Sequence, residues 1–151
     1  MQTQFKLIIG CDLAAYDFKN LAIKELKARG YDVTDIGCWS ALEGDYPQAA
    51  EEVARRVVSG EFDKGLLICG TGQGMAMSAN KVKGARAALC YDIFPALMSR
   101  EHNNSNVLCS GAWMVSLEKY LDIVEAWLFG KYSPGRHDVR INAMLDIENK
   151  R

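Results

Sequence analysis

The sequence is short of the residues on which metal, membrane and nucleic-acid proteins rely. It holds only two histidines among 151 residues, and neither lies near a cysteine pair, so a zinc site is not expected. No apolar run approaches the length that spans a bilayer. The net charge of −1 comes without a face of clustered lysine and arginine. We therefore predict no metal, and neither a membrane nor a nucleic acid as partner.

Paired cysteines are also missing. The five cysteines are an odd number, and no two of them form a C-x-x-C motif. The N-terminal segment MQTQFKLIIGCD lacks the long apolar core of a signal peptide, so we expect reduced thiols in a cytoplasmic protein. Any one thiol can equally be a small buried hydrophobe, which is what we expect of Cys90 and Cys109. The other three are Cys11, Cys38 and Cys69.

What the chain has in quantity is apolar sequence, 49% of its residues, in short runs that alternate with amphipathic segments. Without internal repeats, linkers or low-complexity segments, residues 1–151 are expected to form a single domain. The alternation indicates an α/β fold, a parallel sheet with helices on both faces. We predict strands at 5–10, 31–36, 64–69, 85–89 and 106–109, helices at 17–29, 47–57, 73–82, 94–101, 117–129 and 139–149, and a polar loop at 38–45.

Glycine is concentrated in one segment, LLICGTGQGMAMSANK at residues 66–81. An apolar run ends at Cys69, and three glycines then alternate with Thr71 and Gln73. A strand that leads into such a turn and then a helix presents backbone N–H groups suited to an anion. With a thiol at its edge, this cradle indicates chemistry on an anion, although a tight connection that simply uses glycine is the alternative.

Nucleotide binding is only weakly supported by this turn. A dinucleotide fold needs G-x-G-x-x-G after the first strand and an acidic residue at the end of the second, and a P-loop needs G-x-x-x-x-G-K-[ST]. Here the pattern is G-x-G-x-G after the third predicted strand. A small oxyanion therefore fits the turn better than a nucleotide.

Ligands of parallel sheets bind beyond the carboxyl ends of the strands. That edge is expected to bring together the turn after the first strand, the glycine turn, and the segment around the fourth strand with its helix. Cys11 and Asp12 lie in the first of these turns. Asp12 either serves the site or caps the helix that follows.

Two polar clusters near the C-terminal half are further candidates. His102, in REHNNSNV, can transfer protons near neutral pH or be a solvated helix-end histidine. Arg136 and Arg140, in GRHDVR, are four residues apart, so within a helix they share a face that suits a phosphate. A solvated helix start is the alternative for this second cluster.

Together these motifs resemble one family, the ribose-5-phosphate isomerase B family, which also contains galactose-6-phosphate and allose-6-phosphate isomerases. The resemblance covers nearly the whole chain. It rests on six motifs in order: GCD at 10–12, DYP at 45–47, ICGTGQGM at 68–75, SANK at 78–81, REHNNSNV at 100–107 and GRHDVR at 135–140.

The resemblance implies a fold, an assembly and a reaction. The fold is a Rossmann-like, three-layer α/β/α sandwich of five parallel strands. The assembly is a homodimer, or a dimer of dimers, with active sites at the subunit interface and the C-terminal helix packed on the partner subunit. The reaction is an aldose–ketose isomerisation of a sugar phosphate through a cis-enediolate, without metal or cofactor.

Catalytic roles are implied for four residues. Cys69 matches the base that moves a proton between C1 and C2 of the sugar. Thr71 matches a hydroxyl that assists at the anion hole, and His102 matches the residue that opens the furanose ring, with Asp12 nearby on the sugar hydroxyls. The positions implied for substrate binding are Cys11, Tyr46, Gly70, Gly72, Gln73, Gly74, Asn103, Arg136 and Arg140, of which the two arginines bind the phosphate.

Two positions depart from the family pattern. The family usually reads GCDHAG near the N-terminus, whereas Leu13 stands here in place of the histidine. Trp113 stands where the family often has an arginine. Both changes remove a polar group near the phosphate end, where they could shorten the pocket, reorient the phosphate or admit another acid group. Ribose 5-phosphate is the expected substrate; the alternatives are galactose 6-phosphate, allose 6-phosphate, a tetrose phosphate, or a non-catalytic sugar-phosphate-binding subunit.

Overall fold

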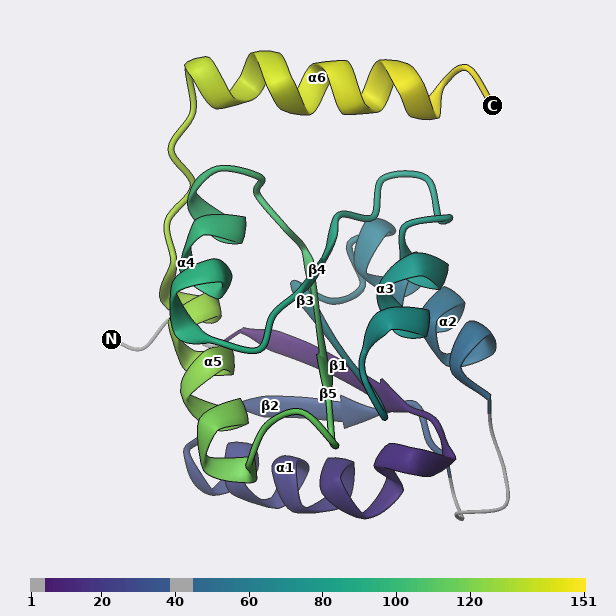
Figure 1. The fold of residues 1–151 in the computed structure, drawn as a ribbon, viewed down its shortest axis with the longest axis vertical. Helices are drawn as coiled ribbons and strands as arrows, with labels where there is room; N and C mark the ends of the chain where they lie inside the picture. Colours follow the sequence, from purple (N-terminus) through teal and green to yellow (C-terminus); the bar gives the residue numbers. More distant parts are fainter. Residues whose placement is uncertain (1–4, 39–44) are drawn as a thin grey trace.

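A computed structural model describes residues 5–38 and 45–151 of the chain. Strands and helices alternate along it (Figure 1), as the sequence predicts. The strands are β1 (Lys6–Cys11), β2 (Asp32–Asp35), β3 (Lys64–Cys69), β4 (Ala87–Leu89) and β5 (Val107–Gly111). The helices are η1 (Leu13–Ala15), α1 (Tyr16–Ala28), α2 (Tyr46–Val58), α3 (Gln73–Ala79), α4 (Ile93–Glu101), α5 (Leu117–Phe129) and α6 (Arg136–Glu148).

The five strands form one parallel sheet in the order β2-β1-β3-β5-β4. Alternate residues of each central strand enter two separate cores. Leu66 and Ile68 of β3 pack in the core beneath α1, α4 and α5, whereas Leu67 and Cys69 pack in the core beneath α2 and α3. Because both faces are covered, the central strands are apolar at nearly every position. The predicted α/β sandwich with a five-stranded parallel sheet is confirmed.

Local differences from the predicted elements lie at turns. The 3₁₀ helix η1 was not predicted; it begins because the Asp12 carboxylate accepts the N–H of Ala15 at 3.3 Å. Helix α6 begins at Arg136, three residues earlier than predicted. There Gly135 has a φ of 86°, and its N–H donates to the Asp138 carboxylate at 2.9 Å. Of the predicted loop at 38–45, residues 39–44 lie outside the described part of the chain.

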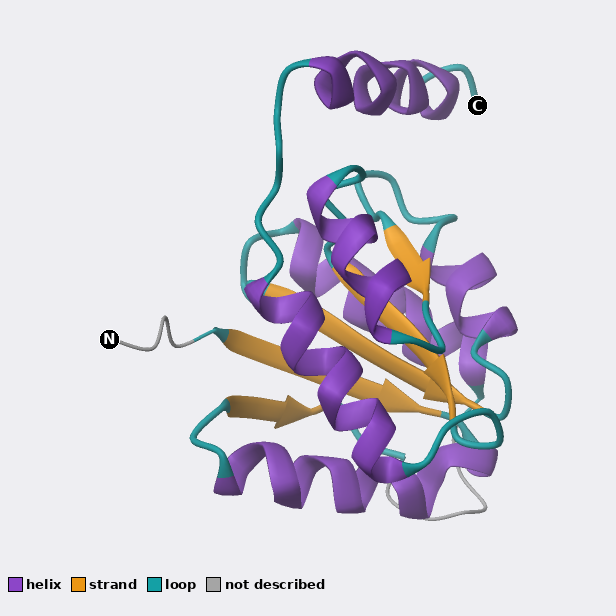
Figure 2. Cartoon of the chain, turned by 60° about the vertical axis from the view of Figure 1, so that its left-hand side comes forward, coloured by secondary structure: helices purple, strands orange, loops and turns teal. Residues whose placement is uncertain are grey.

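The two edges of the sheet carry different elements. The carboxyl ends of the strands lead into η1 and α3, while α4 runs back and ends near the amino ends, where α6 also lies (Figures 1 and 2). Helix α6 stands apart from the layered body, joined to α5 by an extended segment (Figure 2). No helix within residues 5–38 and 45–151 is both long and apolar enough to cross a bilayer.

Candidate active site

The glycine turn after β3 holds the Cys69 thiol in place. The backbone N–H of Gly72 donates to Cys69 Sγ at 3.0 Å. Gly72 has a φ of 82°, and a Cβ there would come within 2.7 Å of the Ser110 carbonyl oxygen. Only glycine fits such a position without strain. The turn therefore needs its glycine in order to direct an amide at the sulfur, where that dipole favours negative charge.

Neighbouring side chains fix the rest of this turn. Thr71 Oγ1 accepts the N–H of Gln73 at 3.3 Å. The hydroxyl of Tyr91, just beyond β4, donates to the Thr71 carbonyl. Tyr91 was missed by sequence reasoning; its signal is a tyrosine two residues past an expected strand, at the edge where parallel sheets bind ligands.

A pocket of about 250 Å³ opens beside the thiol. It gathers residues from four different turns and helix starts, all at the carboxyl edge of the sheet. Six predicted site residues are among them. The other two are Ala14 and Trp113, the residue that departs from the family pattern. The lining residues are Asp12, Ala14, Tyr46, Cys69, Gly70, Thr71, Gly74 and Trp113.

Of the two roles considered for Asp12, capping is confirmed, whereas a role in the site stays a prediction that its place at the pocket allows. Its carboxylate caps η1, and its side chain also lines the pocket. Burial raises the pKa of Asp12 above its ordinary value, and the backbone N–H groups of Ala15 and Ala14 oppose that change. Asp12 is the only charged side chain among the described residues that line this pocket, because no lysine, arginine or histidine is found there.

Three of the other cysteines, Cys11, Cys90 and Cys109, lie outside this pocket. Burial raises the pKa of Cys11 to about 12 and that of Cys90 to about 11, and it raises the pKa of Cys109 as well. These thiols are 2% exposed or less, and Cys11, although adjacent to Asp12, does not line the pocket. Cys90 and Cys109 are thus small buried hydrophobes, as predicted, and none of the five cysteines forms a disulfide.

The second group of predicted residues lies at the opposite edge of the sheet. His102 caps the C-terminal end of α4, and its ring stacks on that of His137 with centroids 4.4 Å apart and planes 14° apart. Arg136 Nε lies 3.4 Å from His137 Nε2. A strand as long as β3 spans about 17 Å, so within one chain His102 is far from Cys69. The expectation that the helix after β4 brings His102 to the carboxyl edge is therefore wrong, because that helix runs antiparallel to the strands.

His137 is the buried member of the stacked pair, with 5% of its surface exposed. Its pKa is lowered, first by burial and then by the positive charges of His102, Arg136 and Arg140. The pair therefore joins the start of α6 to the end of α4 through a neutral ring at ordinary pH.

A buried polar network holds the loop that follows His102. Arg100, itself 9% exposed, donates to the Asn104 side chain at 3.0 Å and to the Ser105 carbonyl. Arg86 Nε donates to the Asn104 carbonyl at 3.0 Å, and Asn104 has a φ of 46°. Trp127 Nε1 donates to Ser105 Oγ at 2.7 Å. These contacts fix a loop backbone that a β-branched or bulky residue at 104 would not adopt.

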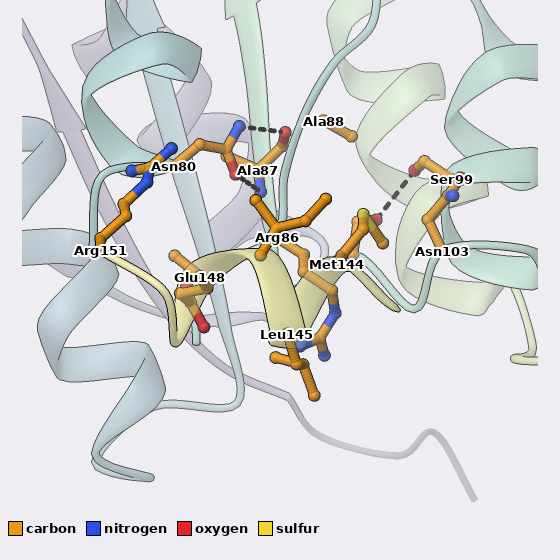
Figure 3. Close-up of a pocket in the computed structure, with 13 residues that line it drawn as sticks. Asn80, Arg86, Ala87, Ala88, Ser99, Asn103, Met144, Leu145, Glu148 and Arg151 are labelled. Atoms are coloured by element: carbon orange, nitrogen blue, oxygen red, sulfur yellow. Dashed lines mark hydrogen bonds between the residues drawn. The ribbon is translucent and has the colours of Figure 1, made fainter. Parts of the chain in front are cut away.

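Asn103 faces a different, larger cavity of about 460 Å³ between the edge strand β4 and α6 (Figure 3). On the body side, the Asn80 amide bonds the backbone of Ala87 at 2.9 Å in both directions. On the α6 side, Glu148 accepts the N–H of Gly84 at 2.9 Å. Of the predicted site residues only Asn103 lines this cavity, so it is separate from the thiol pocket.

The predicted substrate-binding residues are thus divided between two edges. Tyr46, Gly70, Gly72, Gln73 and Gly74 lie with Cys69, whereas Asn103, Arg136 and Arg140 lie with His102. Within residues 5–38 and 45–151, no three His, Cys, Asp or Glu side chains are grouped so as to hold a metal ion.

Comparison with known proteins gives consistent matches over the whole chain. The family model described as Ribose/Galactose Isomerase matches residues 7–144. The chain is 44% identical to ribose-5-phosphate isomerase B of Escherichia coli over 97% of this chain and 98% of that protein. It is 40% identical to D-erythrulose-4-phosphate isomerase 2 of Mycolicibacterium smegmatis over 85% of this chain and 87% of that one. The solved structure of Clostridium thermocellum ribose-5-phosphate isomerase B superimposes with a TM-score of 0.92, at 44% identity, covering 95% of this chain and 97% of that one.

Proposed function

The chain belongs to the ribose/galactose isomerase family, and from this premise we propose that it interconverts ribose 5-phosphate and ribulose 5-phosphate with Cys69 as the base. It is an aldose–ketose isomerase that acts on a sugar phosphate. The observation that carries the choice of base is the thiol at the pocket wall, with the Gly72 N–H directed at its sulfur at 3.0 Å.

The proposed reaction moves two protons, one from C2 to C1 and one from O2 to O1, and needs no external oxidant or reductant. Cys69 thiolate takes the proton from C2 of the open-chain aldose, and the C2–H electrons form the C1–C2 double bond of the enediolate. The π electrons of the C1 carbonyl move onto O1 and make it negatively charged. Amides of residues 70–74 can stabilise this charge. The O2 hydroxyl then gives its proton to O1, and the electrons of the broken O2–H bond form the C2=O2 carbonyl. At the same time the C1–C2 double-bond electrons take the proton back from sulfur at C1, which gives the ketose and regenerates the thiolate.

Cys69 is the thiol best suited to this role. It lines the pocket and receives an amide donor, whereas burial raises the pKa of Cys11, Cys90 and Cys109. A thiol that is not ionised is a poor base. A complete thiol and amide turn also favours a working enzyme over a binding subunit that has lost its chemistry. The reduced thiols fit the cytoplasmic location that we propose.

We further propose that a second copy of the chain completes each site in a homodimer, alone or as half of a dimer of dimers. No described cation lines the thiol pocket, yet the substrate carries a phosphate. His102, Arg136 and Arg140 lie at the other edge of the sheet, from which a partner can supply them. Helix α6 lies outside the layers of its own body (Figure 1), and although His137 and Ile141 are buried, Val139 and Ile147 are more than half exposed, as expected of a helix that packs on a partner.

The first test replaces Cys69 and a matched buried cysteine. We expect Cys69→Ala to lower kcat for ribose 5-phosphate by about 10³-fold, because general-base catalysis is lost. Cys90→Ala, which removes an equally small thiol outside the pocket, should stay within about threefold of the parent chain. Full activity of Cys69→Ala, with retained fold by circular dichroism, would remove Cys69 from the mechanism.

The second test mixes two inactive variants. Cys69→Ala has intact histidine and arginine residues, and His102→Asn has an intact thiol. If sites are shared, co-refolded mixtures regain about one quarter of wild-type activity, because half of the dimers are mixed and each of these has one intact site. If every site is built from one chain, the mixture remains as inactive as its components, which would refute the shared site while leaving the role of Cys69 standing.

A further inference from the structure

Trp113 is an exposed aromatic residue at an unusual position. Its side chain is among the most exposed large apolar ones described, at 73%, although it lies only two residues beyond the buried strand β5. A residue that is so exposed contributes little to the core, which is built from other side chains on both faces of the sheet. An exposed ring that lines a pocket is better explained by what enters the pocket.

The backbone of Trp113 is tied to the catalytic turn itself. Its N–H donates to the Gly70 carbonyl at 3.0 Å, and the preceding Ala112 N–H donates to the Cys69 carbonyl at 2.9 Å. The indole is therefore positioned by the same two residues that carry the thiol and the first amide of the turn. Any movement of the Trp113 backbone relative to Cys69 requires breaking these bonds.

The ring of Trp113 lies directly on Gly70. A Cβ at Gly70 would lie 2.7 Å from Cζ3 and 2.8 Å from Cε3 of the indole, so the six-membered ring occupies the space that a side chain would need. Tyr46 stands in the same relation to Gly74, where a Cβ would lie 2.7 Å from its Cε2. The glycine turn thus has one aromatic wall at its start and another at its end, and both rings line the pocket.

Within one chain, the pocket between these walls has a volume of about 250 Å³, and the residues that we propose a partner supplies would enclose it further. Trp113 brings an apolar face to it, and such a face offers no ionic partner to a phosphate. It suits the C–H groups of a carbon chain next to the reacting C1 and C2.

We propose that Trp113 determines how long a sugar phosphate the enzyme accepts, by closing the pocket on the Gly70 side against six-carbon substrates. This inference rests on the proposed isomerase function and adds to it the class of substrate, namely four- and five-carbon sugar phosphates. Of the possible effects of this residue, shortening the pocket is the one that its contact with Gly70 favours.

The test compares carbon-chain lengths in Trp113→Ala and Trp113→Phe. The measured quantity is kcat/KM for allose 6-phosphate divided by that for ribose 5-phosphate, with erythrose 4-phosphate as the short substrate. We expect Trp113→Ala to raise this ratio by about tenfold or more, as one carbon of pocket space allows. Trp113→Phe keeps an aromatic wall and should change it by less than about threefold. Leu21→Ala, which truncates an exposed apolar residue on α1, is the control.

A binding measurement separates contact from turnover. In a Cys69→Ala background, ribose 5-phosphate should change the indole fluorescence, and the change should vanish in Cys69→Ala/Trp113→Phe, which retains the other two tryptophans. Binding of ribose 5-phosphate without any fluorescence change would show that Trp113 does not touch the substrate. An unchanged chain-length ratio in an active Trp113→Ala would overturn the proposal alone, whereas a wild-type chain inactive on all three phosphates would overturn the proposed function and the proposal together.

Discussion

The two edges of the sheet carry the two halves of the candidate site, but they hold them in different ways. At the carboxyl edge the main chain sets the geometry: Gly72 donates to the Cys69 sulfur, and Ala112 and Trp113 donate to carbonyls of the same turn. At the amino edge side chains set it, through Arg100 and the stacked histidine rings. The thiol is thus built into the sheet, while His102 depends on contacts with a helix that stands apart from the body.

The largest loss of stability is expected where the main chain is disturbed. Gly72→Ala places a Cβ 2.6 Å from Leu89 Cδ1 and 2.7 Å from the Ser110 carbonyl oxygen, at a φ of 82°. We expect a loss of stability of about 2–5 kcal/mol from strain and overpacking. With the amide displaced from the sulfur, activity on ribose 5-phosphate should fall by more than about 10²-fold. Chemical denaturation and steady-state kinetics measure the two losses.

A matched variant separates backbone strain from loss of the cradle. Gly30, at the end of α1, has a φ of 89°, and nothing lies within 4 Å of the place that a Cβ would take there. Gly30→Ala therefore shares the strain without the clash and should cost only about 1 kcal/mol, with activity retained. If the two variants lose the same stability and the same activity, then positive φ alone explains both losses. The contact between the Gly72 amide and the thiol would then have no effect of its own.

An intermediate effect is expected at the amino edge, and it should depend on the substrate. Ribose 5-phosphate closes into a furanose, whereas erythrose 4-phosphate has its O4 phosphorylated and cannot close such a ring. If His102 opens the ring, His102→Asn should lower kcat/KM for ribose 5-phosphate by about 10²-fold and leave that for erythrose 4-phosphate within a few-fold. Equal losses on both substrates would mean that His102 binds the substrate and does not open its ring.

The smallest effect is expected from the neutral ring of the stacked pair. The pKa of His137 is lower in the folded chain than its usual 6.5, so below that value the unfolded chain binds more protons. Stability is therefore complete above pH 6.5 and falls as the pH decreases through the window beneath it. His137→Phe keeps a ring but cannot titrate, so its Tm should fall less between pH 7 and 5, by on the order of 2 °C. Parallel Tm curves for the two proteins would rule out this contribution.

Much of the carboxyl edge was predictable because local sequence determines it. The run from Leu66 to Cys69 and the glycines after it define a strand and a tight turn without reference to distant residues. The apolar strands likewise indicate a sheet covered on both faces. By contrast, η1 depends on a side-chain cap from Asp12, and the early start of α6 depends on Asp138. The spacing of apolar residues along the sequence does not reveal such side-chain hydrogen bonds.

The amino edge was predicted less well for a different reason. The sequence identified His102 and Arg136 as candidate site residues. Their distance from Cys69, however, follows from the direction of α4 and from the place of α6. Trp113 was recognised only as a departure from a pattern; its contact with Gly70 joins positions 43 residues apart and is visible only in three dimensions. Sequence motifs thus identify the residues of the candidate site more readily than the distances between them.

The placement of the two halves on opposite edges has a consequence for how activity responds to dilution. In a two-fold symmetric dimer, each chain contributes the same residues to its partner's site. Both sites therefore form in a single association step. If the site is shared as we propose, a separated chain keeps its thiol turn and its stacked histidines but cannot catalyse the reaction. At chain concentrations below the dissociation constant of the dimer, the total catalytic rate should then fall with the square of the concentration of free chain. The activity per chain would therefore depend on how much of the protein is present.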